Sequence, residues 1–101
     1  MLSIKAESYI SSGCGNELTW PDLDGNTVCG DCKVLVKNMK TKYKTCSSYC
    51  TTIGRMCTGA WEEKSDTCSE KSTEDCQHNF GAYTSDAICE CGEEADSEAG
   101  D

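Results

Sequence analysis

Apolar residues recur at helical spacing in the middle of the chain. Cys32, Leu35 or Val36, Met39 and Tyr43 fall on one face of a helix, and lysines occupy the remaining positions. The residue before this segment is an aspartate, which is a favourable N-cap. The pattern therefore predicts a first helix over about residues 32–43.

A second helix is predicted directly afterwards, over about residues 45–53. Thr45 is a suitable N-cap, and Cys46 and Cys50 lie on one face. Gly54 is a fitting residue for the position after the last turn, where the backbone is often left-handed.

Extended structure is predicted in the second half of the chain. Residues 55–62 and 87–91 are expected to be strands, and the polar, acidic stretch 62–79 is expected to be a long loop with a short strand near 67–69. The expected fold is a small disulfide-rich α+β domain, with two helices on a short antiparallel sheet and five disulfides.

The two ends of the chain differ from its middle. Residues 1–13 alternate only weakly and predict a short strand or a loose arm, while 14–92 form the single expected domain. Residues 93–101 hold no core-forming side chains, so they predict a disordered acidic tail or a linker. The first residues do not form a signal peptide, which suggests a mature form or an excised module.

Composition supports a fold held by disulfides. The chain has 101 residues, ten of them cysteine, with 37% hydrophobic and 7% aromatic residues. That is a thin core for a domain of this size, and the cysteine content is typical of a disulfide scaffold. We expect a secreted or extracellular location, or otherwise another oxidising lumen.

Two cysteine pairs match each other in geometry. Cys46 and Cys50 are four apart in a predicted helix, and Cys89 and Cys91 are two apart in a predicted strand. Residues at these spacings share a face and lie about 6 Å apart in both cases. Two disulfides would therefore join that helix to that strand.

The charge is strongly acidic but uneven. The net charge is −9, which argues against nucleic acid and anionic membrane surfaces as partners. No apolar run is long enough for membrane insertion. One stretch is basic and contains no acid: Lys33, Lys37, Lys40, Lys42 and Lys44.

The helix Cys-x3-Cys and the strand Cys-x-Cys resemble the cysteine-stabilised αβ motif of defensins and scorpion toxins. The resemblance implies Cys46–Cys89 and Cys50–Cys91, and it implies that Cys57 pairs with Cys29 or Cys32. Cys68 and Cys76 would then staple the long loop. All ten cysteines, including Cys14, are expected in disulfides. The stretch from Cys57 to Cys89 is longer than in small defensins.

A second resemblance covers about residues 14–92. It rests on Cys29-Gly-Asp-Cys-Lys-Val-Leu-Val, Cys46-Ser-Ser-Tyr-Cys, Gly59-Ala-Trp-Glu-Glu, Asp66-Thr-Cys and Ser85-Asp-Ala-Ile-Cys-Glu-Cys. These segments resemble an uncharacterised cysteine-rich module of extracellular proteins from marine protists such as dinoflagellates. The resemblance implies a building block of larger extracellular proteins and assigns no functional residues. Size and acidity also resemble secreted ciliate pheromones.

Three oxygen-bearing residues, Asp22, Asp24 and Asn26, are a weak calcium candidate. The glycine precedes the third ligand, and Lys33 stands where an EF-hand has its bidentate glutamate. A tight Asp-Gly-Asn turn is the stronger expectation.

Redox and zinc chemistry are weaker alternatives for the cysteines. Cys29-x2-Cys32 has thioredoxin-like spacing, and with Cys46 and Cys50 it loosely imitates a four-thiolate zinc site. His78 has no nucleophile or paired base signalled nearby. We therefore expect no enzyme activity, no metal and no cofactor.

The candidate binding surface combines aromatic and basic residues. The aromatic residues would form a sugar platform or simply fill the core, and the lysines would dock an acidic partner. The candidate residues are Trp20, Trp61, Phe80, Tyr83, Lys37, Lys40 and Lys44. The expected function is a non-catalytic extracellular module that binds protein or glycan, either alone or within a multi-module protein or a larger assembly. The alternatives are a diffusible signalling or defence protein and a lumenal accessory subunit.

Overall fold

A computed structural model of the chain describes residues 14–82 and 84–94. Within them, five antiparallel strands form one sheet in the order β1-β2-β5-β3-β4. The strands are β1 (Leu23–Gly30), β2 (Lys33–Val36), β3 (Arg55–Glu63), β4 (Glu70–Glu74) and β5 (Ala87–Glu94). The small, disulfide-rich fold with an antiparallel sheet is therefore as predicted.

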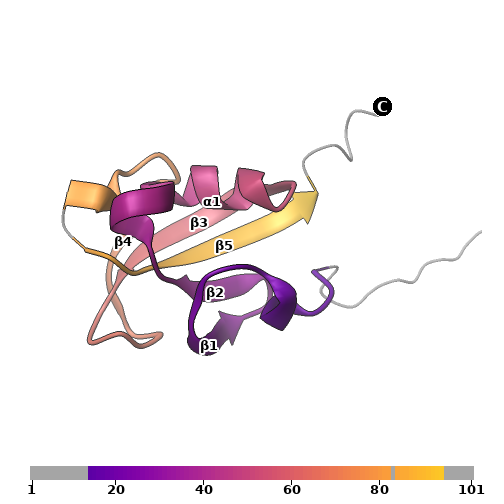
Figure 1. Ribbon diagram of the computed structural model, residues 1–101, viewed down its shortest axis with the longest axis horizontal. Helices are drawn as coiled ribbons and strands as arrows, with labels where there is room; N and C mark the ends of the chain where they lie inside the picture. Colours follow the sequence, from indigo (N-terminus) through magenta and orange to yellow (C-terminus); the bar gives the residue numbers. More distant parts are fainter. Residues whose placement is uncertain (1–13, 83, 95–101) are drawn as a thin grey trace, which may run out of the picture.

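One α-helix, α1 (Cys46–Thr52), lies on one face of this sheet, over β3 and β5 (Figure 1). The Thr45 hydroxyl accepts a hydrogen bond from the Ser48 N–H at 2.9 Å, so Thr45 is the N-cap. Gly54 follows the helix with φ of 74°, a conformation that glycine adopts without steric cost. The second predicted helix is thus confirmed.

The first predicted helix, 32–43, is wrong. Residues Lys33–Val36 form β2 instead, and Cys32 sits in the β1–β2 turn with φ of 61°. Val34, Leu35 and Val36 are three consecutive buried residues, which is typical of a strand covered on both faces. The two valines are also stiff at χ1 and favour strands over helices.

A single turn of π-helix, η3 (Met39–Tyr43), occupies the end of that segment. Two short 3-10 turns complete the secondary structure of the described residues, η2 (Glu17–Thr19) and η4 (Phe80–Ala82). The turns η3 and η4 pack against each other next to α1.

The sheet buries side chains on both faces. Val34, Ala60 and Cys89 are paired across neighbouring strands and face α1, where the main core lies. Leu35 and Ile88 are also fully buried, but they are paired with each other on the opposite face. Alternation along the strands therefore explains why β2 has no exposed apolar residue.

The predicted strands agree with the structure in two places and are displaced in a third. Residues 55–62 lie in β3, and 87–91 lie in β5, which continues to Glu94, beyond the expected domain boundary at 92. The short strand expected near 67–69 is found slightly later, as β4. The expected arm 1–13, and the acidic segment from residue 95 onward, lie outside the described residues.

All ten cysteines form disulfides. Cys46–Cys89 and Cys50–Cys91 join α1 to β5, with Cα–Cα distances of 5.3 Å in both, as the cysteine-stabilised αβ resemblance implied. The three other disulfides are Cys14–Cys32, Cys29–Cys68 and Cys57–Cys76. Five disulfides indicate an oxidising environment.

The expected partners of Cys57, Cys68 and Cys76 are wrong. Strand β4 runs between Cys68 and Cys76, and five extended residues span roughly 17 Å, whereas a disulfide needs Cα atoms within about 7 Å. Cys76 instead bonds Cys57 on the neighbouring strand.

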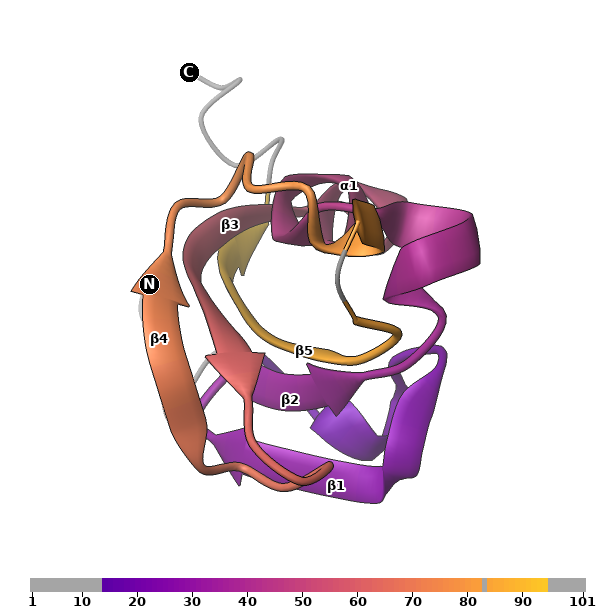
Figure 2. The same ribbon diagram turned by 90° about the vertical axis from the view of Figure 1, so that its left-hand side faces the viewer.

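The Cys29–Cys68 disulfide closes the open side of the sheet. Cys29 belongs to β1, the first strand in the sheet order, and Cys68 lies two residues before β4, the last strand. Figure 2 shows that the sheet bends so that these two edge strands approach each other. The bond therefore joins the two edges of a strongly curved sheet.

Candidate binding surface

The connection between β2 and α1, residues 37–44, carries four of the nine basic residues of the chain and no acidic residue. Asn38 is left-handed, with φ of 66°, and turns the chain out of β2 into η3. Asparagine tolerates this conformation better than most residues. The Tyr43 N–H and the Lys44 N–H then bond to the carbonyls of Asn38 and Met39, five residues back, which makes the turn a π-turn.

This connection is attached firmly to the core. Met39 and Tyr43 are buried, and the Tyr43 ring packs edge-on against Tyr49 with ring centroids 4.9 Å apart. The Met39 N–H bonds to the Ser85 carbonyl at 2.8 Å, and the Phe80 N–H bonds to the Lys44 carbonyl at 2.7 Å. Both ends of η3 are therefore held by the segment that leads into β5.

Asp22 stabilises the connection through hydrogen bonds to three of its side chains. Its carboxylate accepts hydrogen bonds from the Tyr43 hydroxyl at 2.5 Å, the Lys42 ammonium at 3.0 Å and the Asn38 amide at 3.2 Å. The hydrogen bonds from Tyr43 and Lys42 lower the pKa of Asp22 below its ordinary value. Lys42 is therefore used to hold the turn.

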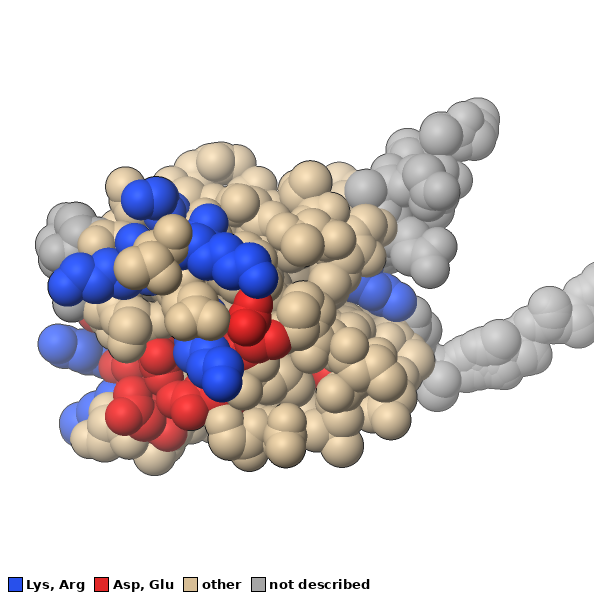
Figure 3. Space-filling view, in the orientation of Figure 1, with Lys and Arg blue, Asp and Glu red and all other residues tan. Residues whose placement is uncertain are grey.

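The other three lysines of the connection, Lys37, Lys40 and Lys44, are exposed and form no ion pair with any described residue. We call these three residues the lysine ridge. Figure 3 shows basic side chains gathered at the left of the view, beside a group of acidic side chains. The ridge is a compact basic surface on an acidic protein.

Lys44 has an unusual backbone conformation. It has φ of 69° and ψ of −42°, and the Thr45 N–H bonds to the Tyr43 carbonyl at 2.7 Å across it. These are the features of a γ-turn of the rare, strained kind. A lysine here costs conformational energy that a glycine would avoid, and such outliers are found preferentially at functional positions.

A second charged cluster contains Asp24, Asp66 and Asp86, which we call the carboxylate trio. One oxygen of each lies within 4.8 Å of the others. Asp24 comes from β1, Asp66 from the β3–β4 loop and Asp86 from the residue before β5. Burial, and then the neighbouring Asp24 carboxyl, raise the pKa of Asp86 to about 7.

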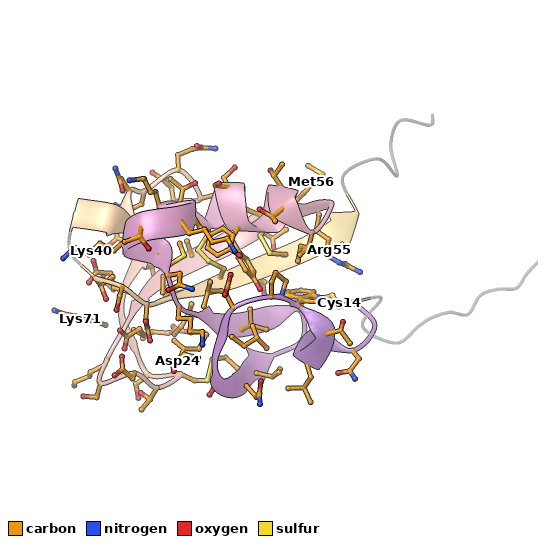
Figure 4. The ribbon with its side chains drawn as sticks, viewed as in Figure 1. Cys14, Asp24, Lys40, Arg55, Met56 and Lys71 are labelled. Carbon is orange, nitrogen blue, oxygen red and sulfur yellow. A yellow bond between two sulfur atoms is a disulfide. The ribbon has the colours of Figure 1, made fainter. Side chains whose placement is uncertain are left out.

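The expected calcium loop does not form as a set. Asp22 is committed to Tyr43, Lys42 and Asn38, Asp24 belongs to the carboxylate trio, and Asn26 is an exposed residue with φ of 55°. The Asp-Gly-Asn turn is present as an irregularity in β1. Of the three candidates, only Asp24, labelled in Figure 4, has further acidic neighbours among the described residues that could contribute to a cation site.

The aromatic residues do not form a platform among the described residues. Phe80 is fully buried and packs edge-on against His78, with ring centroids 4.8 Å apart. Trp20 is 8% exposed, and the Arg55 guanidinium lies 5.5 Å from its ring centroid. Tyr83 lies outside the described residues.

Trp61 lies on the opposite face of the sheet from the main core, in the same cross-strand row as Ile88. Its ring covers Gly59, where a Cβ atom would lie 2.5 Å from a ring carbon. The Lys33 ammonium sits 4.0 Å from the ring centroid and also bonds to Glu70 at 2.6 Å. Trp61 is therefore a packing residue engaged by Gly59 and Lys33.

His78 lies between the carboxylate of Glu62 in β3 and that of Glu74 in β4. Its Nδ1 atom is 3.5 Å from Glu74, and its Nε2 atom is 4.0 Å from Glu62. Because the two carboxylates face different nitrogens of the ring, they do not converge on one point as metal ligands would. The arrangement supports a structural contact between β3, β4 and the segment before η4.

Cys29 and Cys32 do not form a redox or zinc pair. Each is bonded to a distant cysteine, Cys29 to Cys68 and Cys32 to Cys14. Cys46 and Cys50 are likewise bonded to β5. The CxxC spacing reflects a hairpin whose two ends are fastened to different parts of the fold.

Comparison of this chain with family models, curated proteins and solved structures finds no match. Membership of the marine protist module therefore stays a prediction. No helix of the described residues is long and apolar enough to cross a membrane.

Proposed function

We propose that this protein is a non-catalytic extracellular recognition module whose lysine ridge binds an acidic protein surface. The observation that supports the proposal most is the exposure of Lys37, Lys40 and Lys44 on a turn that the core holds in place. The five disulfides, which require an oxidising environment, support the extracellular setting.

Rigid attachment favours binding because little order has to be created on association. The backbone of η3 is held through Met39, Tyr43 and Lys44, so only the lysine side chains lose freedom when a partner docks. Lysine is a compact charge that accepts varied geometries of carboxylate. A surface of this kind suits a partner with several acidic side chains.

A protein partner is favoured over a sulfated glycan by the surroundings of the ridge. The net charge of the chain is −9, and acidic side chains lie directly beside the lysines (Figure 3). A long polyanion would have to pass from the ridge over this acidic surface, and like charges repel. An acidic protein segment can be short and can carry complementary charge on either side.

The proposal is tested by titrating the ¹⁵N-labelled protein with a ten-residue Glu/Asp peptide and following amide shifts. We expect shifts confined to residues 37–44 and their neighbours, which weaken as salt is added. The same peptide with Gln and Asn in place of its acids is the ligand control, and a heparin oligosaccharide tests the glycan alternative.

A pair of charge-matched variants provides the protein control. Lys40→Gln/Lys44→Gln removes two charges from the ridge, and Lys64→Gln/Lys71→Gln removes two from exposed positions of the β3–β4 hairpin. We expect the first variant to lose peptide binding at least fivefold and the second to retain it. Equal loss in both variants, binding only to heparin, or no binding at all would contradict the proposal.

A further inference from the structure

The backbone of Lys44 is held on both sides by hydrogen bonds. Its N–H bonds to the Met39 carbonyl at 2.8 Å, and its carbonyl accepts from the Phe80 N–H at 2.7 Å. The bond from the Thr45 N–H to the Tyr43 carbonyl closes the γ-turn across it. The direction in which the Lys44 side chain leaves the backbone is therefore fixed by the fold.

The side chain of Lys44 begins beside Gly81, in the turn η4. A Cβ atom added to Gly81 would lie 3.5 Å from Lys44 Cγ, which is ordinary van der Waals contact, and 3.4 Å from the Lys40 carbonyl oxygen. The aliphatic stem of Lys44 therefore passes close to η4, and a side chain branched at Cβ would compete with it for space. At Lys40, by contrast, it is the backbone carbonyl that lies near η4.

Turn η4 is itself held by the core, so it is a rigid support for this stem. Phe80 is fully buried, and its carbonyl accepts from the Thr84 N–H at 3.0 Å. The Asn79 side chain accepts a hydrogen bond from the Gly81 N–H at 2.8 Å. Turns η3 and η4 pack side by side (Figure 1). Lys44 is thus supported at its backbone and along its stem.

We propose, on the basis of the function proposed above, that Lys44 is the anchor residue of the lysine ridge and contributes more to binding of an acidic protein segment than Lys37 or Lys40. A lysine side chain loses rotamer freedom when its ammonium group pairs with a carboxylate. At Lys44, the fixed backbone and the packed stem account for part of this loss before a partner binds. Gly81 is then a positioning residue, which acts on the partner only through Lys44.

The strained backbone of Lys44 supports this assignment. Among the three lysines of the ridge, all of which the structure describes, only Lys44 has a positive φ. This conformation costs energy in every molecule, with or without a partner. A glycine would avoid the cost, but it would place no ammonium group beside η4.

The order of the lysine side chains in the free protein is the first test. Relaxation of ¹³C at each Cγ methylene group measures this order on the picosecond-to-nanosecond timescale. We expect Cγ of Lys44 to be more ordered than Cγ of Lys37 and Lys40. Equal order at all three lysines would overturn the inference.

Three variants that lose the same charge test the contribution of each lysine to binding. Affinity for the ten-residue Glu/Asp peptide is expected to fall about fourfold in Lys44→Gln and about 1.5-fold in Lys37→Gln or Lys40→Gln. Long-range electrostatics alone would predict nearly equal losses, because each variant loses one positive charge. Lys44→Arg keeps the charge and is expected to bind within about twofold of the wild type.

Gly81→Val tests the support beneath the stem without changing the charge. We expect it to lower both the order of Lys44 Cγ and the affinity for the peptide, and to have no further effect on affinity in the Lys44→Gln background. Gly30→Val is the matched control, because a Cβ atom at Gly30 would lie 3.7 Å from the stem of Lys33, which is not part of the ridge. This control is expected to change neither quantity.

The outcomes separate this inference from the proposed function. Equal losses in the three charge variants would overturn the inference and leave the proposed function intact. The same holds for a loss in Gly81→Val that persists in the Lys44→Gln background. Absence of peptide binding by the wild type would contradict both. The three charge variants keep the inference testable even where Gly81→Val does not fold.

Discussion

The α1–β5 region and the β2–α1 connection are both rigid, but different forces hold them. Helix α1 has only seven residues and is bonded to β5 by two disulfides. The connection, residues 37–44, contains no cysteine and depends on hydrogen bonds to Asp22, Ser85 and Phe80. In this chain, disulfides hold the α1–β5 region, whereas hydrogen bonds hold the backbone of the basic connection.

The largest expected effect is the loss of one disulfide in the stapled region. Cys46→Ala/Cys89→Ala removes a fully buried bond between residues 43 apart in the sequence. Loop closure alone predicts a loss of roughly 3–4 kcal/mol in the free energy of unfolding, measured by urea denaturation with the other four disulfides intact. A loss below about 1 kcal/mol would mean that packing, without the bond, holds α1 in place.

Asp86 lies between the two regions, next to the Ser85 carbonyl that holds Met39. Its pKa of about 7 exceeds the ordinary value of 3.8, so the folded protein binds more protons than the unfolded chain between these values. Its contribution to stability is therefore present at low pH and is lost as pH rises from about 4 towards 7. Asp86→Asn is expected to raise the free energy of unfolding at pH 7.5 by about 1–3 kcal/mol.

The measurement for Asp86→Asn is urea denaturation at pH 4.5 and pH 7.5. The variant is expected to gain mainly at the higher pH. An equal change at both pH values would indicate a packing effect instead of titration, and it would contradict the proposed origin of the shift.

The hydrogen-bonded connection is tested by removing one hydroxyl. Tyr43→Phe deletes the donor to the Asp22 carboxylate and is expected to cost about 1.5–3 kcal/mol at neutral pH. Because the pKa of Asp22 is lowered in the fold, its stabilisation is present above pH 4 and is lost on acidification through that lowered pKa. The cost of Tyr43→Phe should therefore shrink at pH 2–3.

Tyr49→Phe is the matched control for this prediction. The Tyr49 hydroxyl donates to the Pro21 carbonyl at 2.7 Å, and this acceptor carries no charge. The expected cost is about 1 kcal/mol, with no such decrease at low pH. The same pH dependence in both variants would show that Asp22 is not the cause.

The smallest expected effect separates the stability of the connection from its binding. Lys44→Gly removes the strain at φ of 69° and is expected to stabilise the fold by about 0.5–1 kcal/mol while weakening binding of the acidic peptide. Lys40→Gly, inside η3, is expected to weaken both, with a cost of about 0.5–1 kcal/mol. Destabilisation by Lys44→Gly would mean that the lysine side chain supports the turn.

The same contrast explains which parts of the fold could be predicted from the sequence. In α1, the cap Thr45, the cysteine spacing and Gly54 are local signals that agree with the tertiary contacts. In the preceding segment, the helical spacing of Leu35 or Val36 with Met39 competes with three consecutive apolar residues. Burial on both faces of the sheet decided in favour of the strand, and a run of three apolar residues does not by itself distinguish a buried strand from a buried helix.

The candidate surface was predictable in part. The lysines of the ridge are visible as a basic stretch without acids, and they are exposed as expected, although on a turn and not on a helix. Trp20 and Phe80 were equally visible, but only tertiary contacts show that they are buried. The carboxylate trio escaped prediction because Asp66 and Asp86 are distant from Asp24 in the chain and come together through the bending of the sheet.

The Cys29–Cys68 bond has a consequence for solubility. An open sheet exposes unpaired backbone groups on its two outer strands, and these can recruit strands from other molecules into aggregates. Here one bond holds β1 near the start of β4, so both outer strands are constrained at once. Oxidation of this single pair is therefore expected to limit edge-to-edge association as well as unfolding.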